Sequence, residues 1–349
     1  METSVIPTVM DLADISEEKL LESRICDLPL AIEGTWLAER IVQLYKELED
    51  KGLKFRPACY LADEWLTPQG EPVIGIPFYL AHAALTRLEK KMMLEAEGET
   101  REECMKLLRH ECGHAISYAY QLHKKKRWQQ IFGPSSKEYG DTFRFRPYSK
   151  NYVRHLDGFY AQFHPDEDFV ETFAVWLTPG ADWRKTYQGW PALKKLLYVE
   201  ELMLSVIAKD PLVAKGVKHW HFKNLKITLN NFYKKKREFW AEEFPDFHDG
   251  NLKRIFSPDP DGANALTAGE FLKRYEKQLV GDIVRWTGER KYVVSNLLKA
   301  ATQRCRDLKL SAPQDHSIAL ANLAVYITTL VMNYIYTGWY RGDKEKRKR

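Results

Sequence analysis

The chain has 349 residues, of which 44% are hydrophobic and 29% charged, and its formal net charge is +5. This composition is typical of a globular protein with a sizeable core and excludes a disordered chain. The charge is small for the length and mixed in sign, so it does not indicate a nucleic-acid-binding protein. Five cysteines without paired spacing, and an N-terminus without a basic segment and apolar core, predict a cytoplasmic protein with reduced thiols.

The first part of the chain predicts helices and a small sheet. Residues 16–26 and 35–50 have the spacing of amphipathic helices. Two apolar runs rich in β-branched and aromatic residues, 53–63 and 72–80, are separated by the turn-rich residues 64–71. Such runs are typical of strands, so we expect both in one sheet.

A long helix is predicted to follow. Residues 82–98 return to helical spacing and end at a glycine, and Thr100 with Glu103 then has the pattern of a capping box. The helix that opens there contains the stretch "LLRHECGHAISYAYQL", residues 107–122. Gly113 lowers its helix propensity, and we expect a close approach of this helix to a neighbouring strand to explain the glycine.

A long loop region and a further helix come next. Residues 124–164 contain Gly, Pro, Ser and aromatic residues without a clear period, which predicts loops that could hold short strands. Pro165 suits the first turn of a helix over residues 166–177, which Pro179 and Gly180 end. The chain beyond Trp183 is predicted to be mostly helical.

The stretch "HECGH" carries the residues of a zinc site. His110 and His114 lie one helical turn apart, so they can present two imidazoles to one ion. Glu111 lies beside them, placed to reach a water molecule on that ion and not to bind it. This is the HExxH arrangement, in which the glutamate is the general base of a metalloprotease.

The third zinc ligand has to come from elsewhere in the chain. No histidine follows at the spacing of the metzincin pattern, so a carboxylate is the better candidate. Glu167 and Glu171 lie one turn apart beside an aromatic and apolar stripe, where unpaired carboxylates would be costly to bury. One of them would bind the ion and the other would accept the second ring N–H of a ligand histidine. The spacing leaves open which does which.

Several stretches of the sequence resemble known zinc enzymes. HExxH with a distant ExxxE resembles the gluzincin branch of the zinc metallopeptidases, and four stretches resemble a bacterial family of zinc-binding metallopeptidases: "IPFYLAH", "RHECGHA", "LDGFYAQFHPDEDFVETFAVWLTP" and "GWPALKKLLYVEELM". The resemblance implies Glu167 as the third zinc ligand, Glu171 as the partner behind a ligand, and Tyr160 as the donor that stabilises the oxyanion. It supplies no substrate.

Together these features predict an α+β protein. We expect a zincin-like catalytic domain with a small sheet and an active-site helix over residues 1–212, and a mostly helical C-terminal region over residues 213–349 that packs on it. The expected activity is zinc-dependent hydrolysis of peptide bonds, with Glu111 as general base. The strand around Ile76 could pair with an extended peptide substrate. The alternative is a non-catalytic protein that keeps zinc, or only the helices, to bind a partner.

Two further features invite other interpretations. Residues 317–340 contain no charged residue and are long enough to span a bilayer, but polar residues interrupt them, so we expect a buried helix. Membrane association through this segment is the second alternative. His82, His155 and His164 could be alternative ligands, and we expect them to be structural or surface residues.

Overall fold

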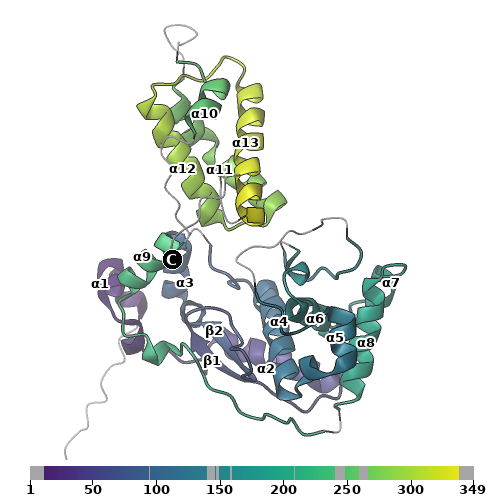
Figure 1. The fold of residues 1–349 in the computed structure, drawn as a ribbon. Coiled ribbons are helices and arrows are strands. Elements are labelled where there is room, and N and C mark those ends of the chain that lie inside the picture. The colour runs from purple at the N-terminus through teal and green to yellow at the C-terminus, as the bar shows by residue number, and fades with distance from the viewer. Residues whose placement is uncertain are drawn as a thin grey trace, which may run out of the picture. The chain divides into compact units, whose positions relative to one another are not determined.

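The computed structural model describes residues 12–93, 95–139, 146, 149–157, 159–207, 209–239, 248–258 and 266–337 (Figure 1). These residues form an α+β fold that is mostly helical and contains a two-stranded parallel sheet, as the sequence predicted. The chain divides into two compact units, the first made mostly of residues up to 234 and the second mostly of residues 235–349. The domain boundary expected at residues 212–213 stays a prediction, because a division into compact units does not show which segments fold as independent domains.

The first unit holds the sheet and the two helices that carry the candidate site. Its elements are α1 (Glu17–Glu22), α2 (Trp36–Asp50), β1 (Ala58–Ala62), β2 (Val73–Pro77), α3 (Ala83–Met93), α4 (Arg101–Ala119), α5 (Lys126–Phe132), α6 (Pro165–Leu177), α7 (Trp183–Thr186), α8 (Ala192–Leu204) and the start of α9 (Leu229–Phe239). Helix α4 packs on α6, on α2 and on β2, so it lies at the centre of the unit (Figure 1).

The sheet is smaller than the apolar runs suggested. β1 and β2 pair in parallel, with Tyr60 opposite Gly75, and residues 53–57 lie outside the strand. On the edge of β2 that faces away from β1, the backbone N–H and C=O of Gly75 form hydrogen bonds of 2.8 and 3.3 Å with Leu66. A Cβ on Gly75 would lie 2.6 Å from the Leu66 side chain, so only glycine fits between Leu66 and Ala62. The segment after β1 therefore folds back along the outer edge of β2.

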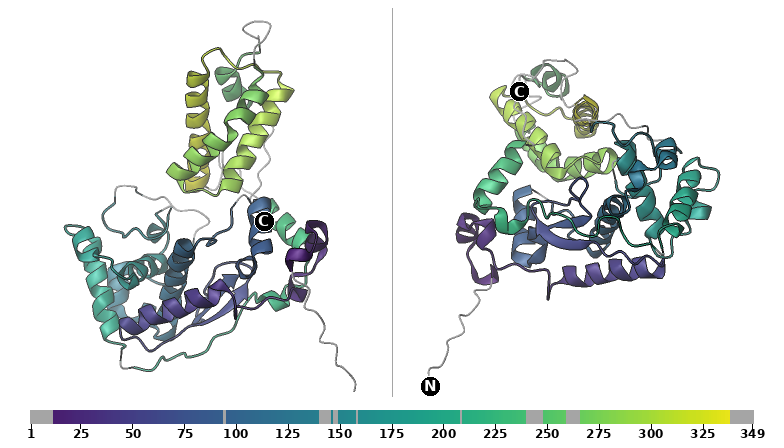
Figure 2. Two further views of the ribbon diagram at one scale, coloured as in Figure 1. Left: turned by 180° about the vertical axis from the view of Figure 1, so that it is seen from behind. Right: turned by 60° about the horizontal axis from the view of Figure 1, so that its bottom comes forward.

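The second unit is built from α10 (Asp249–Ile255), α11 (Ala268–Thr287), α12 (Lys291–Asp307) and α13 (His316–Thr337). The last three lie side by side in both views of Figure 2 and pack on one another. At the start of α11 the Thr267 hydroxyl accepts the Glu270 N–H and the Glu270 carboxylate accepts the Thr267 N–H, so this helix begins with a complete capping box. Gly288 ends α11 in the left-handed region, at φ 71°.

Helix α13 contains the uncharged segment that the sequence analysis singled out. By length and composition, residues His316–Ile335 could cross a membrane, and 28% of their apolar 18-residue window is buried in the fold. One face, which includes Leu323 and Ile327, is fully buried in the core of the second unit, whereas Ile318 and Val325 on another face are 59% and 68% exposed. The described part of the segment is a helix, as expected, but only one of its faces is buried, and residues 338–340 lie outside the described residues.

Candidate metal centre

Helix α4 brings the two histidines of HECGH to one face. The helix begins where the Thr100 side chain accepts the Glu103 N–H, which is half of the capping box that the sequence predicted. The His110 and His114 rings, one turn apart, have their centroids 5.2 Å from each other. Both side chains are buried, at 4% and 8% exposed. Burial of two imidazoles without a partner would be costly, so the groups facing them decide what they do.

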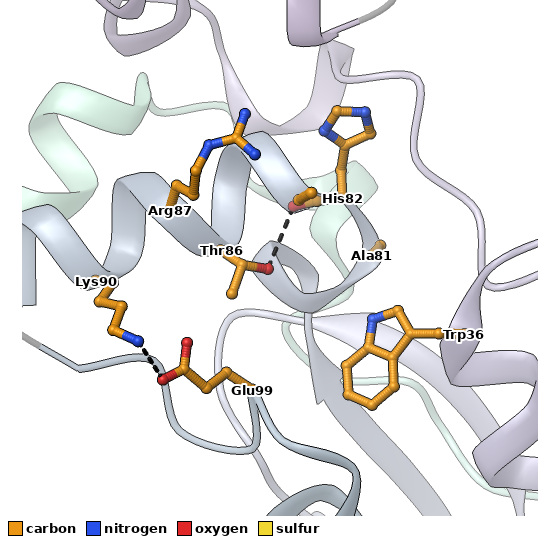
Figure 3. A pocket seen from close by; sticks show the side chains of 8 residues that line it. Trp36, Ala81, His82, Thr86, Arg87, Lys90 and Glu99 are labelled. Carbon is orange, nitrogen blue, oxygen red and sulfur yellow. Dashed lines mark hydrogen bonds and ion pairs between the residues drawn. The ribbon is translucent and has the colours of Figure 1, made fainter.

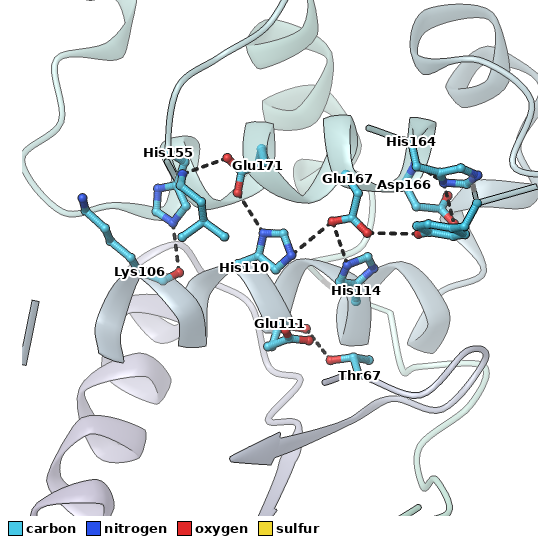
Figure 4. A network of polar contacts seen from close by, with 12 residues as sticks. Thr67, Lys106, His110, Glu111, His114, His155, His164, Asp166, Glu167 and Glu171 are labelled. Atoms are coloured by element: carbon cyan, nitrogen blue, oxygen red, sulfur yellow. Dashed lines mark hydrogen bonds and ion pairs between the residues drawn. The ribbon is translucent and has the colours of Figure 1, made fainter. Parts of the chain in front are cut away.

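Helix α6 supplies two carboxylates to the same place. Pro165 occupies its first turn as predicted, and the His164 side chain caps it by accepting the Asp166 N–H. Glu167 and Glu171 follow one turn apart and are 4% and 0% exposed. The carboxylates therefore project from α6 toward the histidines of α4 (Figure 4).

Gly113 allows the two helices to approach each other closely. A Cβ at this position would lie 2.8 Å from the Val170 Cβ and 3.0 Å from the Val170 Cα on α6. The expected close approach is therefore present, but the expectation of a strand as the neighbour was wrong, because helix α6 occupies that place. The glycine lies in the turn between the two histidines, so this contact sets how near the carboxylates come.

Three side chains converge on one point. His110 Nε2 lies 3.2 Å and His114 Nε2 lies 3.4 Å from the same oxygen, Glu167 Oε2 (Figure 4). This buried oxygen has no hydrogen-bond partner among the described residues. Ligands held about 2.0–2.1 Å from a tetrahedral zinc ion lie about 3.3 Å from one another. The donor set and its spacing therefore fit a zinc ion bound by His110, His114 and Glu167, with a fourth position left for water.

Glu171 holds His110 from behind. Its Oε1 lies 2.8 Å from His110 Nδ1, and its Oε2 accepts the Leu156 N–H at 2.9 Å. The bond at Nδ1 leaves Nε2 of the ring for an ion and fixes the tautomer that a metal ligand needs. Glu167 thus lies at Nε2 of both histidines and Glu171 lies at Nδ1 of His110, and the roles of ligand and partner that the resemblance implies for them stay predictions.

The pKa shifts of His110, His114 and Glu167 show which positive charges a bound cation would replace. Burial opposes the charged form of His110, but the carboxylates of Glu167 and Glu171 outweigh it and raise the pKa of this imidazole well above its ordinary value. At His114, burial likewise opposes the charged form, but the Glu167 carboxylate outweighs it and the pKa of the imidazole is raised. Despite burial, the two imidazoles lower the pKa of Glu167. Without a metal, protons on the imidazoles balance the carboxylates, and a dication would take over that role.

Glu111 lies beside the three ligands on α4. It is 7% exposed, and its Oε2 has no hydrogen-bond partner among the residues that the structure describes. The Thr67 hydroxyl donates a hydrogen bond of 3.0 Å to the backbone carbonyl of Glu111, so this contact does not occupy Oε2 of the carboxylate (Figure 4). Burial raises the pKa of the Glu111 carboxyl. A carboxylate with a raised pKa and an uncommitted oxygen suits proton transfer near neutral pH.

The Tyr160 ring lies next to the His110 ring. The two ring centroids are 5.6 Å apart. The residue before it, Phe159, has a left-handed backbone at φ 58°, which is uncommon for a bulky side chain and directs the chain into the short turn that carries Tyr160. Burial raises the pKa of the Tyr160 hydroxyl, so it keeps its proton and can donate a hydrogen bond.

The other candidate histidines make contacts that do not suit metal binding. His164 uses Nδ1 to accept the Asp166 N–H and Nε2 to donate to the Lys137 carbonyl at 2.7 Å. His155 contacts the Lys106 carbonyl through Nε2 at 2.9 Å (Figure 4). His82 accepts the Ala84 N–H at 3.2 Å. These contacts agree with the structural roles expected for them.

A separate hollow of about 370 Å³ opens beside α3 (Figure 3). It is lined by residues of α2, α3 and the turns next to them, namely Trp36, Ala81, His82, Ala83, Thr86, Arg87, Lys90 and Glu99. His110, His114, Glu167 and Glu171 are not among these residues. Across it, Lys90 forms a 2.6 Å ion pair with Glu99, so this hollow holds a satisfied surface pair and is not the candidate active site.

Sequence reasoning missed two contributions to the site. Tyr139, in the region predicted as loop, donates a hydrogen bond from its hydroxyl to Glu167 Oε1 at 3.1 Å. Leu66, in the turn-rich stretch, occupies the edge of β2 at Gly75 and so removes the free edge that the peptide-pairing hypothesis assumed there. Both depend on contacts between residues far apart in the sequence, for which a single sequence gives no periodic signal.

Comparison with known proteins supports the metal-binding interpretation. Residues 76–209 match the model of a family described as "putative zinc-binding metallo-peptidase", which confirms the resemblance to a zinc-binding metallopeptidase family over that segment, whereas the resemblance to the gluzincin branch stays a prediction. The segment contains both histidines of α4 and both glutamates of α6. No curated protein and no solved structure matches the chain.

Proposed function

We propose that the protein is a zinc-dependent peptidase. The observation that carries the proposal is the convergence of His110 Nε2 and His114 Nε2 on one buried oxygen of Glu167, at the spacing of tetrahedral zinc ligands. The family match over residues 76–209 supports both the metal and the peptidase activity. We propose peptides or proteins as substrates, and neither a nucleic acid nor a membrane as a partner.

The residues of the chain divide the chemistry between them. A zinc ion at this site would supply an activated water molecule and polarise the scissile carbonyl. Glu111 would take the proton of the attacking water on its uncommitted oxygen and deliver it to the leaving amine. Tyr160 would donate a hydrogen bond from its hydroxyl to the oxyanion that develops on the scissile carbonyl. Glu171 would keep the His110 ring oriented throughout.

Glu111→Gln tests this division of roles. The variant should lose about 10²–10⁴-fold in the rate of hydrolysis of a fluorogenic peptide library, because the amide cannot accept the proton. It should still bind zinc, because Glu111 is not a ligand. Glu102→Gln is the matched control, since Glu102 is an exposed glutamate in the first turn of the same helix and should keep full activity.

The alternative is a protein that binds zinc without catalysis. It is favoured by one observation, the backbone pairing of Leu66 with Gly75, which occupies the strand edge where a peptide could pair. A wild-type chain that binds zinc but hydrolyses no member of the library would support this alternative. Equal rates for wild type and Glu111→Gln would instead remove Glu111 from the mechanism.

We also propose a cytoplasmic location. All five cysteines are free thiols in the structure, and burial raises the pKa of Cys59, Cys104, Cys112 and Cys305. Buried thiols with a raised pKa are poorly reactive and suit a reducing compartment. Fractionation of cells that produce the full chain would test the location, and recovery with membranes would contradict it.

A further inference from the structure

We propose that Tyr139 is a positioning residue of the metal centre, which holds Glu167 so that only one carboxylate oxygen faces the ion. The inference rests on the proposed function, since it takes Glu167 as a metal ligand. It adds a residue that neither the HExxH pattern nor the glutamate helix contains.

The two oxygens of Glu167 have different surroundings. Oε2 faces the two histidine nitrogens at 3.2 and 3.4 Å and has no hydrogen-bond partner among the described residues. Oε1 accepts the hydroxyl proton of Tyr139 at 3.1 Å. A tyrosine hydroxyl is protonated at neutral pH, so it donates to the carboxylate and occupies that oxygen. Glu167 is thereby prepared to bind an ion through Oε2 alone.

Tyr139 is anchored to the helix that carries Glu167. Its ring stacks on the His164 ring, with centroids 3.8 Å apart and planes inclined by 18°. His164 is 2% exposed, caps α6 through Nδ1, and donates from Nε2 to the Lys137 carbonyl two residues before Tyr139. The imidazole thus ties the segment before Tyr139 to the first turn of α6, which fixes the hydroxyl relative to the carboxylate.

The arrangement parallels the one at His110. Glu171 occupies the nitrogen of His110 that faces away from the ion, and Tyr139 occupies the oxygen of Glu167 that faces away from it. Groups that orient metal ligands in this way typically change metal affinity by about 10–100-fold when they are removed. Without the hydroxyl, the Glu167 carboxylate could rotate or bind through both oxygens.

Tyr139→Phe tests the inference, because it removes the hydroxyl and keeps the ring that stacks on His164. We expect the zinc dissociation constant, measured by chelator competition, to rise about 10–100-fold. In the cobalt-substituted protein we expect weaker visible absorption, since a second carboxylate oxygen raises the coordination number above four. A purely structural role in the loop would leave the cobalt spectrum of the folded protein unchanged.

Tyr118→Phe is the matched control. The Tyr118 ring stacks beside His114, with centroids 6.2 Å apart, and its hydroxyl bonds to none of the candidate ligands in the described structure. Its zinc affinity should stay within about twofold of wild type, well below the effect expected at an orienting group. If Tyr139→Phe also keeps the wild-type affinity and cobalt spectrum, the inference is wrong while the zinc site stands. If the wild-type chain binds no zinc, the proposed function fails instead.

Discussion

The two units of the protein bury different kinds of residue. Among the described residues of the first unit, seven charged side chains are buried, namely Glu47, Glu89, Arg109, Glu111, Glu167, Asp168 and Glu171. In the described part of the second unit no Asp, Glu, Lys or Arg is buried, and the core consists of apolar side chains from α10 to α13. Buried charge is costly unless it is paired or binds a metal, so its distribution marks the first unit as the one organised for chemistry.

Helices α4 and α13 show the same difference within single elements. Helix α4 carries buried Arg109, His110, Glu111 and His114, whereas the described part of α13 has no charged residue after His316 yet exposes Ile318 and Val325. Apolar composition alone therefore does not identify the most buried helix of this chain. Contacts with other groups decide how deeply a helix is buried. Each buried charged residue of α4 should therefore have a neighbouring group that explains its burial.

The largest effect is expected at the ion pair that supports α4. Arg109 donates two hydrogen bonds of 2.8 Å to the Glu47 carboxylate on α2, and both side chains are buried. Glu47→Ala leaves the Arg109 charge unpaired, so we expect the free energy of unfolding of the first unit to fall by about 3–5 kcal/mol. Chemical denaturation, followed by tryptophan fluorescence, measures this loss.

A similar pair in the second unit provides the control. Arg304 binds the Asp249 carboxylate through two hydrogen bonds of 2.6 and 2.8 Å, but both side chains are about a quarter exposed. Asp249→Ala should destabilise the protein far less than Glu47→Ala, because water replaces the lost partner. Equal losses in the free energy of unfolding for the two variants would contradict the distinction between the units.

The next effect concerns the apolar core of the second unit. Leu323 on α13 is fully buried, and Leu323→Ala should lower the free energy of unfolding by about 2–5 kcal/mol through lost contacts and a cavity. Val325→Ala, on the exposed face of the same helix, should change it by about 0.5 kcal/mol or less. Thermal denaturation of both variants measures the difference. Equivalent effects at the two positions would contradict a helix with one buried face.

Two glycines should respond with opposite signs. Gly113→Ala forces a methyl group against Val170, and overpacking should cost about 1–3 kcal/mol and weaken zinc binding by separating α4 from α6. A Cβ added to Gly281, inside α11, would meet no atom within 4 Å, so Gly281→Ala should stabilise the protein by up to about 1 kcal/mol through helix propensity. Denaturation and zinc titration of both variants test this. Stabilisation at both positions would show that α6 yields to the added methyl group.

A smaller effect is expected from pH. Despite burial, nearby carboxylates raise the pKa of His110 and His114 in the metal-free protein, so protons must leave before zinc can bind. Zinc affinity should therefore rise with pH, about tenfold per unit for each proton released, and level off above the raised pKa values. Calorimetric zinc titrations between pH 6 and 8 measure this dependence, and a zinc affinity that does not change with pH would contradict it.

The same ion pairs affect the stability of the metal-free chain. The stability that they contribute is present below the ordinary histidine pKa of about 6.5 and is lost as pH rises through the raised pKa values of the folded protein.

Local signals in the sequence predicted much of the fold. Thr100 and Pro165 begin α4 and α6 at the places their patterns indicated, because these signals act within one helical turn. The i, i+4 spacing of the histidines and glutamates likewise placed each pair on one helical face. These features depend on residues only a few positions apart, which a single sequence displays directly.

Contacts between distant segments could not be predicted. Tyr139 lies 28 positions before Glu167, in a region without a clear period, where the structure also contains the unpredicted helix α5. Glu47 and Arg109 are 62 positions apart, and nothing in either local pattern links them. The sequence analysis expected a strand opposite Gly113, where the structure has α6. A glycine in a helix indicates that something packs closely there, but the local sequence does not show which element it is.

The central claim is that His110, His114 and Glu167 bind one zinc ion, and the zinc content of the purified chain tests it most directly. We predict about one zinc per chain by elemental analysis, lost in His114→Ala and Glu167→Ala and reduced without complete loss in Glu171→Ala, because Glu171 only orients His110. A folded wild-type chain without zinc would contradict the account. Retention of zinc by Glu167→Ala with loss in Glu171→Ala would assign the third ligand to Glu171 instead.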